Sequence, residues 1–524
     1  MLLPMKPAHR SRRLALPVVA TLVASAALAV VAAPAALAAT TPRPAPSPIA
    51  AGFNHTLALA SDGTVRAFGS GGNGDLGVGS HAEHDTPVQV KGVGGTGVLS
   101  HVAAVAAGSN YSLALLATGN VVAWGYNVNG SLGDHSNVER TLPVYVKSPT
   151  NIKLSGVVAI AASPIGTTSL ALKSNGTVWA WGSNNQGQLG NNDGFHQDTN
   201  TPVQVTGPGG SGFLTGVVAI AVGAEHSVAL KSNGSVWTWG GNGAGQLGNG
   251  TDGPSGQDAP VQVHNIDNVG MLSQVVGVSA GGYFTIALRS DGTMVGWGDD
   301  NYGQLGDNAP GSHSDLPVAP VGLGGRLVAI AAGYINTYAL KQDGTVWAWG
   351  DDFNGAIGDG TNSGTPVATP VRVNRLVDGS GVVSLAGGFG RGEAVTSPGV
   401  VYGWGYNASG QLGDSTTINA TSPVRTVTVP KIANPALRVL VAPKISGTAA
   451  AGHTLSVSKG TWGLPATSWA YQWLRSGAAI LHATHATYTL TTADKGKRIS
   501  VRVTASRSGY PSGHTTTAAR TVSS

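Results

Sequence analysis

The sequence predicts an all-β fold: a seven-bladed β-propeller followed by a small immunoglobulin-like β-sandwich. First, a phrase made of an apolar run, a glycine loop, a hairpin and an aromatic-glycine stop returns seven times, at intervals of roughly 52 to 58 residues. Second, 78 glycines and only 10% charged residues are typical of a turn-rich β protein. Third, the last hundred or so residues lack the phrase but keep short alternating segments, which indicates a second β domain.

The N-terminal segment has the three parts of a secretory signal. Four basic residues precede an apolar stretch over 14–37, which ends at Ala36-Leu37-Ala38. We therefore expect residues 1–38 to be a signal peptide and the protein to be secreted or extracellular. An uncleaved membrane anchor is the alternative, because the stretch is nearly long enough to span a bilayer. Pro34 and the run of alanines favour cleavage after Ala38.

Each repeat contains a predicted hairpin. In the fourth repeat, the alternating segments 227–231 and 235–240 flank Asn233-Gly234. An Asn-Gly or Asp-Gly pair predicts a tight two-residue turn in which both residues have positive φ. The pair stands at this point in five repeats, at Asp62-Gly63, Asn175-Gly176, Asn233-Gly234, Asp291-Gly292 and Asp343-Gly344.

An aromatic residue followed by glycine ends every hairpin. The seven stops are Phe68-Gly69, Trp124-Gly125, Trp181-Gly182, Trp239-Gly240, Trp297-Gly298, Trp349-Gly350 and Trp404-Gly405. A large ring at one recurring position favours packing between adjacent sheets over a carbohydrate platform, and the glycine allows close backbone approach.

These stops, with Gly-Gln-Leu-Gly after four of them, resemble the repeat of the regulator of chromosome condensation (alpha-tubulin suppressor-like) family. The similarity covers about residues 49–427 and implies a seven-bladed propeller over 39–427. His55 and His226 occupy the family's histidine position. Repeat three departs from the pattern at Ser163, with an insertion of two residues. Which end of the chain supplies the closing strand of the ring stays open.

The repeats contain no recognisable pattern of catalytic or metal-binding residues. The chain has no cysteine, which excludes thiol catalysis and cysteine-ligated metals. His55 and His226 lie in different repeats without a third ligand, and no strained nucleophile motif marks a serine. We therefore predict no catalytic residue, no cofactor and no metal. A weak calcium site near Asp299, Asp300, Asp351 and Asp352 is the alternative to a solvated acidic surface, which we favour.

The triplet at each glycine loop varies from repeat to repeat. Variable aromatic and polar residues on a repeating frame are typical of a binding surface, although they could equally cover the blade ends. The candidate partner-binding residues are Phe53, Asn54, Tyr111, Glu225, Tyr283, Phe284, Tyr334, Phe389 and Arg391.

The tail differs from the repeats in charge. Residues 39–427 hold 15 basic and 24 acidic side chains, a balance of −9, whereas residues 428–524 hold 11 basic side chains and Asp494, a balance of +10. We expect a linker over 428–440 and a domain over 441–524. That domain resembles the immunoglobulin-like modules of bacterial secreted proteins, with Trp473 as the core tryptophan. Its charge favours attachment to anionic wall polymers over specific nucleic acid, since no reading motif accompanies it.

Together these features indicate a secreted or cell-surface, non-enzymatic binding scaffold, monomeric, which recognises an unknown protein or surface ligand through propeller loops. A hydrolase or lyase of wall polysaccharide, with acidic groups near the channel, is the enzymatic alternative. The family resemblance adds two further roles: a secreted bacterial member inhibits β-lactamases, and the nuclear founder exchanges nucleotide on a small GTPase. Predicted export argues against the nuclear role.

Overall fold

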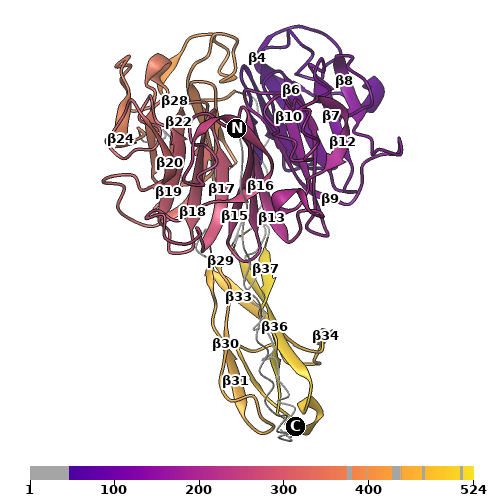
Figure 1. The fold of residues 1–524 in the computed structure, drawn as a ribbon. Coiled ribbons are helices and arrows are strands. Elements are labelled where there is room, and N and C mark those ends of the chain that lie inside the picture. Colours follow the sequence, from indigo (N-terminus) through magenta and orange to yellow (C-terminus); the bar gives the residue numbers. More distant parts are fainter. Residues whose placement is uncertain are drawn as a thin grey trace, which may run out of the picture. The chain divides into compact units, whose positions relative to one another are not determined.

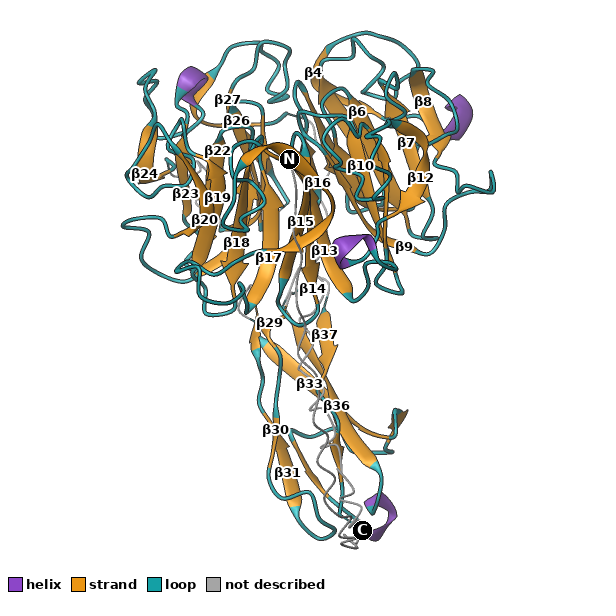
Figure 2. Ribbon diagram, viewed as in Figure 1, coloured by secondary structure: helices purple, strands orange, loops and turns teal. Residues whose placement is uncertain are grey.

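The computed structural model describes residues 47–374, 381–397, 399–427, 437, 439–462, 466–507 and 512–523. The predicted signal peptide and residues 428–436 of the predicted linker lie outside them. Within the described residues the secondary structure is β, apart from four single-turn 3-10 helices: η1 (Val93–Gly95), η2 (Pro208–Gly210), η3 (Phe353–Gly355) and η4 (Thr492–Asp494) (Figure 2). No helix in this part of the chain is long and apolar enough to cross a membrane.

Residues 49–425 form seven four-stranded antiparallel sheets, each built from one continuous stretch of chain (Figure 1). We number them sheets 1 to 7 in chain order. Sheets 1 to 4 consist of β1 (Ile49–Ala51), β2 (His55–Leu59), β3 (Val65–Gly69), β4 (His84–Gln89); β5 (Val102–Ala107), β6 (Tyr111–Leu116), β7 (Val121–Gly125), β8 (Arg140–Tyr145); β9 (Val157–Ala162), β10 (Thr168–Lys173), β11 (Val178–Gly182), β12 (Thr199–Gln204); β13 (Val217–Val222), β14 (His226–Lys231), β15 (Val236–Asn242), β16 (Gly253–Gln262). Sheets 5 to 7 consist of β17 (Val275–Ala280), β18 (Phe284–Arg289), β19 (Met294–Asp299), β20 (His313–Val318); β21 (Leu327–Ala332), β22 (Asn336–Lys341), β23 (Val346–Gly350), β24 (Val367–Arg372); β25 (Val382–Gly388), β26 (Arg391–Thr396), β27 (Val401–Gly405), β28 (Ala420–Arg425).

The hairpin between the second and third strand of each sheet lies where it was predicted, but its geometry differs. Gly63 has φ 79°, whereas Asp62 does not have positive φ. The Gly63 N–H donates to Ala60 O and the Ala60 N–H to Thr64 O, so the loop has three residues with glycine in the left-handed position. Asp62 Oδ1 accepts the N–H of Thr64 at 2.9 Å. The prediction of a two-residue turn with two positive φ angles is therefore wrong. Asp62 keeps a negative φ, and its side chain stabilises the turn by accepting the Thr64 N–H.

The aromatic stops join neighbouring sheets, as the repeat predicted. All six tryptophans are fully buried, and each indole N–H donates to a backbone carbonyl in the loop after the stop of the preceding sheet. The pairs are Trp124–Asp75, Trp181–Ser131, Trp239–Gln188, Trp297–Gln246, Trp349–Gln304 and Trp404–Ala356, at 2.8 to 3.1 Å. Phe68 fills the equivalent place in sheet 1 without a donor.

Sheet 7 also contacts sheet 1, so the seven sheets form a closed circle. Each sheet contacts the next along the chain, and β25 and β26 contact β1. Ile49, Ala51 and Phe68 of sheet 1 share one buried apolar cluster with Val383 and Val395 of sheet 7. Within the described residues no strand pair joins the two sheets, so side chains and loop contacts make the closure, such as the Ser415 N–H that donates to Asp85 O at 3.1 Å.

The tail forms three small sheets around its own core. They consist of β29 (Val439–Val441) with β32 (Thr461–Trp462); β30 (Ile445–Ser446), β31 (Thr454–Val457) and β35 (Thr487–Thr489); and β34 (Ala478–Ala479), β33 (Ser468–Arg475), β36 (Arg498–Ser506), β37 (Gly513–Thr516) and β38 (Arg520–Thr521). Trp473 is fully buried, and its indole N–H donates to His485 O at 2.9 Å. Leu437 and Val439 belong to this core, so the predicted linker end at residue 440 is too late.

Candidate functional site

The third residue of each triplet is part of the scaffold. It is the first residue of the second strand and pairs in register with the stop glycine, as in Tyr111 with Gly125 and Phe284 with Gly298. In sheets 1, 2, 4, 5 and 7 its ring or guanidinium lies beneath the loop glycine. A Cβ added to Gly281, for example, would lie 2.0 Å from the Phe284 ring. Tyr111, Phe284 and Arg391 are 0% exposed, so their prediction as partner-binding residues is wrong.

Three of these buried residues form a hydrogen bond with the next sheet. His55 Nε2 lies 2.9 Å from Ser112 Oγ, and His226 Nε2 lies 2.8 Å from Thr285 Oγ1. The Tyr111 hydroxyl donates to Thr168 O at 2.7 Å. Burial lowers the pKa of both His55 and His226 to about 3, so both rings are neutral at physiological pH.

Arg391 makes the corresponding connection between sheets 7 and 1. Its guanidinium donates to Phe53 O and His55 O, both at 2.7 Å, and pairs with Glu393 at 3.1 Å. Glu393 in turn accepts the Thr56 hydroxyl at 2.5 Å. The unusual Arg391-Gly392-Glu393 sequence of the last repeat therefore forms a buried charged network at the closure.

The insertion predicted in the third repeat is confirmed by the turn it forms. In sheet 1 the Gly52 N–H donates to the O of His55, three residues ahead. In sheet 3 the Ser163 N–H donates to Thr168 O, five residues ahead, and Ser163 Oγ accepts the Gly166 N–H at 2.7 Å. The longer loop leaves this triplet without an aromatic side chain.

The aromatic residues at the first two triplet positions are half-exposed, and on one side of the sheet circle they form a stack of rings. Phe53 of sheet 1 stacks on Phe389 of sheet 7 with 4.1 Å between ring centroids. Phe389 stacks on Tyr334 of sheet 6 at 5.4 Å and meets the edge of Tyr406 at 5.9 Å. We call these four residues the aromatic mouth.

Tyr406 was not predicted as a site residue. It directly follows the stop glycine Gly405, and the register places that glycine beside the triplet of the same sheet. The antiparallel hairpin brings the triplet and the stop together. The position after each stop could therefore have been added to the candidate site residues from the repeat alone.

Acidic and phenolic groups continue the aromatic mouth towards sheets 4 and 5. Glu225 and Tyr283 are both half-exposed, and burial raises the pKa of Glu225. Burial raises the pKa of Tyr283, as do the nearby Glu225, Tyr334 and Asp299. Sheet 2 carries small and polar residues at the first two triplet positions instead, Ser109 and Asn110. Asn54 is half-exposed beside Phe53.

The acidic residues after the stops of sheets 5 and 6 are not a solvated surface, contrary to our prediction. Asp299, Asp300, Asp351 and Asp352 are at most 7% exposed. Asp299 Oδ2 accepts the Gln304 amide at 2.7 Å, and Asp352 Oδ2 accepts the Ser363 N–H at 2.7 Å. Among the described residues, no group of three or more His, Asp or Glu side chains is placed to hold a metal ion.

A channel of about 410 Å³ is lined by the first strands of all seven sheets. Its lining is mainly alanine, valine and isoleucine, as in Ala106, Ile160 and Val278, with Ser47, Ser279 and Ser384 as hydroxyl groups. The described lining contains no acidic, basic or histidine side chain. The acidic groups that the enzymatic alternative requires are therefore absent from this part of the channel wall.

Comparison with known proteins gives this architecture a family. The family model of the RCC1-like domain matches residues 32–273 and 147–467, which together span most of the chain. The chain belongs to the RCC1-like domain family. The resemblance expected from the repeats is thereby confirmed, and the match explains why the stops and loop glycines recur at fixed positions.

Relatives of this RCC1-like chain include the ultraviolet-B receptor UVR8 of Arabidopsis thaliana, 29% identical over 379 residues that cover 72% of this chain and 80% of the receptor. The human E3 ubiquitin-protein ligase HERC2 is 30% identical over 342 residues, 64% of this chain, but the match spans only 7% of the ligase.

Solved structures support the propeller-like fold. The structure of Prp20p from Saccharomyces cerevisiae has a TM-score of 0.57 at 24% identity, covering 71% of this chain and 87% of Prp20p. Human WBSCR16 has a TM-score of 0.59 at 22% identity, covering 70% and 94%. Prp20p was described with its binding to Gsp1p and histones, and yeast RCC1 with bound Kap60. RCC1-like relatives thus bind proteins.

Proposed function

We propose that the RCC1-like part is a seven-bladed propeller that binds a protein or surface ligand through the aromatic mouth and does not act as an enzyme. The observation that carries this proposal is the stack of Phe53, Phe389 and Tyr334, which joins rings from three sheets at half-exposed positions. Rings held in place by a rigid scaffold lose little conformational entropy on binding, and such residues dominate many interfaces. The protein binding of Prp20p supports the same role.

Loss of the aromatic mouth tests this proposal. We expect Phe53→Ala combined with Phe389→Ala to weaken capture of the extracellular partner at least tenfold, because central aromatic contacts carry much of the binding energy. The measurement is a pull-down from extracellular fractions, followed by titration of the partner identified. Phe195→Ala with Phe213→Ala is the matched control, since those rings are 79% and 58% exposed outside the mouth.

Thermal unfolding of both double variants shows whether the fold is retained. Equal partner binding by a folded mouth variant would refute the proposal. If the captured partner is a β-lactamase, the inhibitor alternative gains its first support. A hydrolysis or elimination product formed by the purified protein would favour the wall-polysaccharide enzyme instead.

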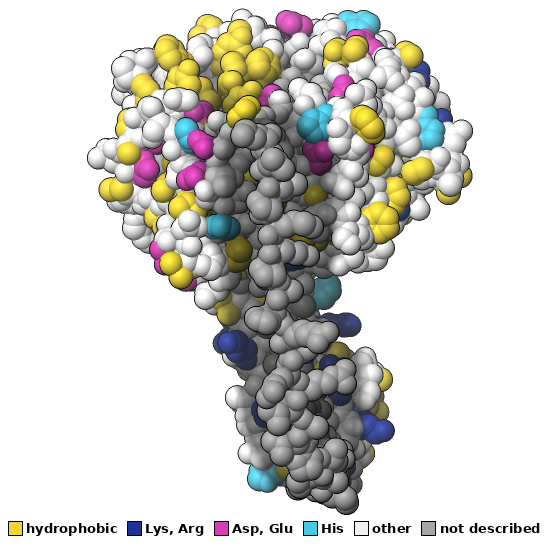
Figure 3. Space-filling model, viewed as in Figure 1, with side chains coloured by type: hydrophobic (Ala, Val, Ile, Leu, Met, Phe, Trp, Pro, Cys, Tyr) yellow, Lys and Arg dark blue, Asp and Glu magenta, His cyan; other side chains and the backbone are white. Residues whose placement is uncertain are grey.

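The tail supports a second role, as an immunoglobulin-like module that holds an exported protein on anionic wall polymers. Its basic side chains are exposed, among them Lys444, Lys459, Lys495, Lys497, Arg498 and Arg502. In the face drawn in Figure 3, acidic side chains lie on the seven sheets, and basic ones are frequent on the tail. The single acid, Asp494, is buried and paired with Arg475 at 2.7 Å. The exposed cations are therefore available to a polyanion.

Charge removal tests this attachment. We expect Lys497→Gln with Arg502→Gln to lower the salt concentration that elutes the full chain from an immobilised anionic polymer, because fewer cations contact it and salt screens the rest. Lys91→Gln with Arg372→Gln removes the same charge from exposed positions of the seven sheets. Identical elution of the two double variants would contradict a role for the tail.

A further inference from the structure

A buried asparagine organises the loop after the stop in several sheets. It lies two residues beyond the stop glycine, and its side-chain oxygen accepts the N–H of the leucine in the Gly-x-Leu-Gly turn. The pairs are Asn127–Leu132, Asn184–Leu189, Asn242–Leu247 and Asn407–Leu412, at 2.9 to 3.1 Å. This bond fixes the turn, and a carbonyl of the same turn accepts the indole N–H of the tryptophan in the next sheet.

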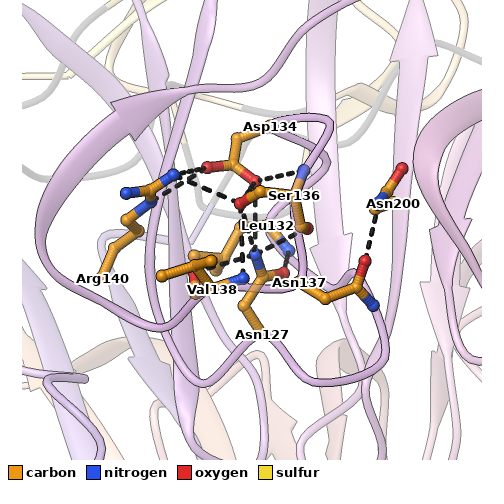
Figure 4. A network of polar contacts seen from close by, with 8 residues as sticks. All are labelled: Asn127, Leu132, Asp134, Ser136, Asn137, Val138, Arg140 and Asn200. Atoms are coloured by element: carbon orange, nitrogen blue, oxygen red, sulfur yellow. Dashed lines mark hydrogen bonds and ion pairs between the residues drawn. The ribbon is translucent and has the colours of Figure 1, made fainter.

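In sheet 2 the amide nitrogen of this asparagine is surrounded by oxygens (Figure 4). Asn127 Nδ2 donates to Asp134 Oδ1 at 3.2 Å, to Ser136 O at 2.9 Å and to Val138 O at 3.1 Å. Sheet 7 repeats the arrangement, with Asn407 Nδ2 within 3.1 Å of Asp414 Oδ1, Thr416 O and Ile418 O. The surrounding oxygens therefore act as hydrogen-bond acceptors, and a donor group fills the space between them.

Sheet 5 places a carboxylate at this position. Asp300 Oδ1 accepts the Leu305 N–H at 2.7 Å, as the asparagines do. Its other oxygen, Oδ2, takes the place of the amide nitrogen and has no hydrogen-bond partner, although Asp300 is only 1% exposed. An unsatisfied buried carboxylate oxygen is costly, so a cation or a shared proton would stabilise this loop, whereas the asparagine amide fills the same place in sheets 2 and 7.

A second carboxylate, that of Asp307, lies within hydrogen-bonding range of the Asp300 carboxyl group. Asp307 follows the Gly-x-Leu-Gly turn as Asp134 does, and its Oδ1 accepts the Ala309 N–H at 2.9 Å, as Asp134 accepts that of Ser136 at 3.1 Å. Asp134 is neutralised by Arg140 at 2.8 Å. Arg140 lies opposite the stop glycine of sheet 2, whereas the residue at that position in sheet 5 is Ser314. Within the described chain, Asp307 therefore has no ion-pair partner.

The loop also closes over Asp300. The Asp300 N–H donates to Ser312 O at 2.9 Å, and the Gly311 N–H donates to Asp300 O at 3.0 Å. Asp307 is half-exposed, which leaves one side of the pair open to solvent. Two carboxylates, backbone carbonyls and access to water are the ligands that calcium takes, with six to eight oxygens in flexible geometry.

We propose that Asp300 and Asp307 bind a calcium ion within the loop of sheet 5, in the place that an asparagine amide fills in sheets 2 and 7. The ion lies within one loop rather than between the acidic loops of neighbouring sheets. In sheet 6 the Ser363 N–H and the Thr361 hydroxyl donate to Oδ2 of Asp352, which therefore has donors that Oδ2 of Asp300 lacks, although Asp352 Oδ1 has none. Burial, followed by the nearby Asp307 and Asp299, raises the pKa of Asp300 to about 7, and a bound cation lets both carboxylates ionise at neutral pH.

Calcium titration of the full chain tests the site. We expect calorimetric titration of EDTA-treated protein with CaCl2 to show a site that Asp300→Asn abolishes. Calcium should raise the Tm of the wild type by a few degrees, roughly 2–4 °C, and leave that of the variant unchanged. Asp300→Asn should fold, because asparagine occupies this position in four other sheets.

Asp343→Asn is the matched control. It removes an equally charged group from an exposed hairpin turn, where Asn175 and Asn233 stand in other sheets, and should bind calcium like the wild type. Equal calcium binding by Asp300→Asn and wild type would overturn the proposal, as would absence of binding at millimolar calcium. If the wild type instead loses stability above pH 7 while Asp300→Asn does not, the pair holds a proton, and the calcium site is refuted.

Discussion

At the residue scale, one position performs the same task with chemically different side chains. The third triplet residue is histidine, tyrosine, phenylalanine, asparagine or arginine, yet it is buried in each of these sheets. Three of the polar ones bond to the neighbouring sheet through different groups: a hydroxyl for His55 and His226, a carbonyl for Tyr111. Sequence variation suggested a binding surface here, because a linear pattern does not reveal that the next sheet covers the position.

The buried histidines make stability depend on pH. His226 has a folded pKa of about 3, below its ordinary value of 6.5, so the unfolded chain takes up a proton that the folded chain does not. The contribution of neutral His226 to the free energy of unfolding is complete above about pH 6.5. It is lost as the pH falls towards 3, by about 1.4 kcal/mol per pH unit.

His226→Asn tests this dependence, because Asn336 occupies the same position in sheet 6. We expect the variant to be less stable than the wild type at pH 7.5, and the difference to shrink by about 1.4 kcal/mol for each pH unit below 6.5. Urea unfolding at several pH values measures it. A difference that stays constant between pH 7.5 and 5 would show that His226 does not titrate on unfolding.

At the scale of the structural element, the hairpins and stops were predictable because they depend on short-range chemistry. Gly234 and Gly344 have φ of 83° and 85°, values that glycine adopts without strain. The number of residues in the turn was not predictable from the dipeptide, since Asp-Gly fits both a two-residue turn and a three-residue turn with a glycine bulge. The aromatic mouth was foreseen in Phe53, Tyr334 and Phe389, but their stacking depends on how sheets 6, 7 and 1 meet.

The Gly-x-Leu-Gly turn offers a test of how closely the sheets pack. A Cβ added to Gly248 would lie 2.7 Å from the Trp297 ring of the next sheet, whereas at Gly270, which also has positive φ, nothing lies within 4 Å. We expect Gly270→Ala to cost about 1 kcal/mol, from backbone conformation alone. Gly248→Ala should cost roughly 3 kcal/mol or more, because it adds a clash in a packed core.

The measurement is the free energy of unfolding in urea for both variants. Because the two glycines share the backbone conformation, the difference between the variants isolates the contact with Trp297. Equal destabilisation would mean that the tryptophan can move aside and that the stop does not fix the spacing of neighbouring sheets.

At the scale of the whole molecule, the closure between sheets 7 and 1 depends on side chains. Arg391 and Glu393 are fully buried, and Arg391 binds two carbonyls of sheet 1. We expect Arg391→Met to destabilise the protein by roughly 3–5 kcal/mol, because it leaves Glu393 buried without its cation. Urea unfolding measures the loss.

Two further variants make this prediction specific. Arg391→Met with Glu393→Leu should be more stable than Arg391→Met alone, because the unpaired charge is gone. Lys341→Met, which removes a cation lying 3.6 Å from the Trp347 ring at the surface, should cost about 1 kcal/mol or less. A loss for Arg391→Met as small as that for Lys341→Met would mean that the apolar cluster around Phe68 alone closes the circle.

The continuity of every sheet in the sequence also bears on how such a chain arises. Because no hydrogen-bonded strand pair joins one repeat to another among the described strands, a single stretch of DNA encodes a complete sheet together with its loops. Duplication or recombination of that stretch transfers a whole unit without breaking a strand pair. The loops of different units are then free to diverge separately, so aromatic residues could gather on one side of the circle while acidic loops arose in sheets 5 and 6.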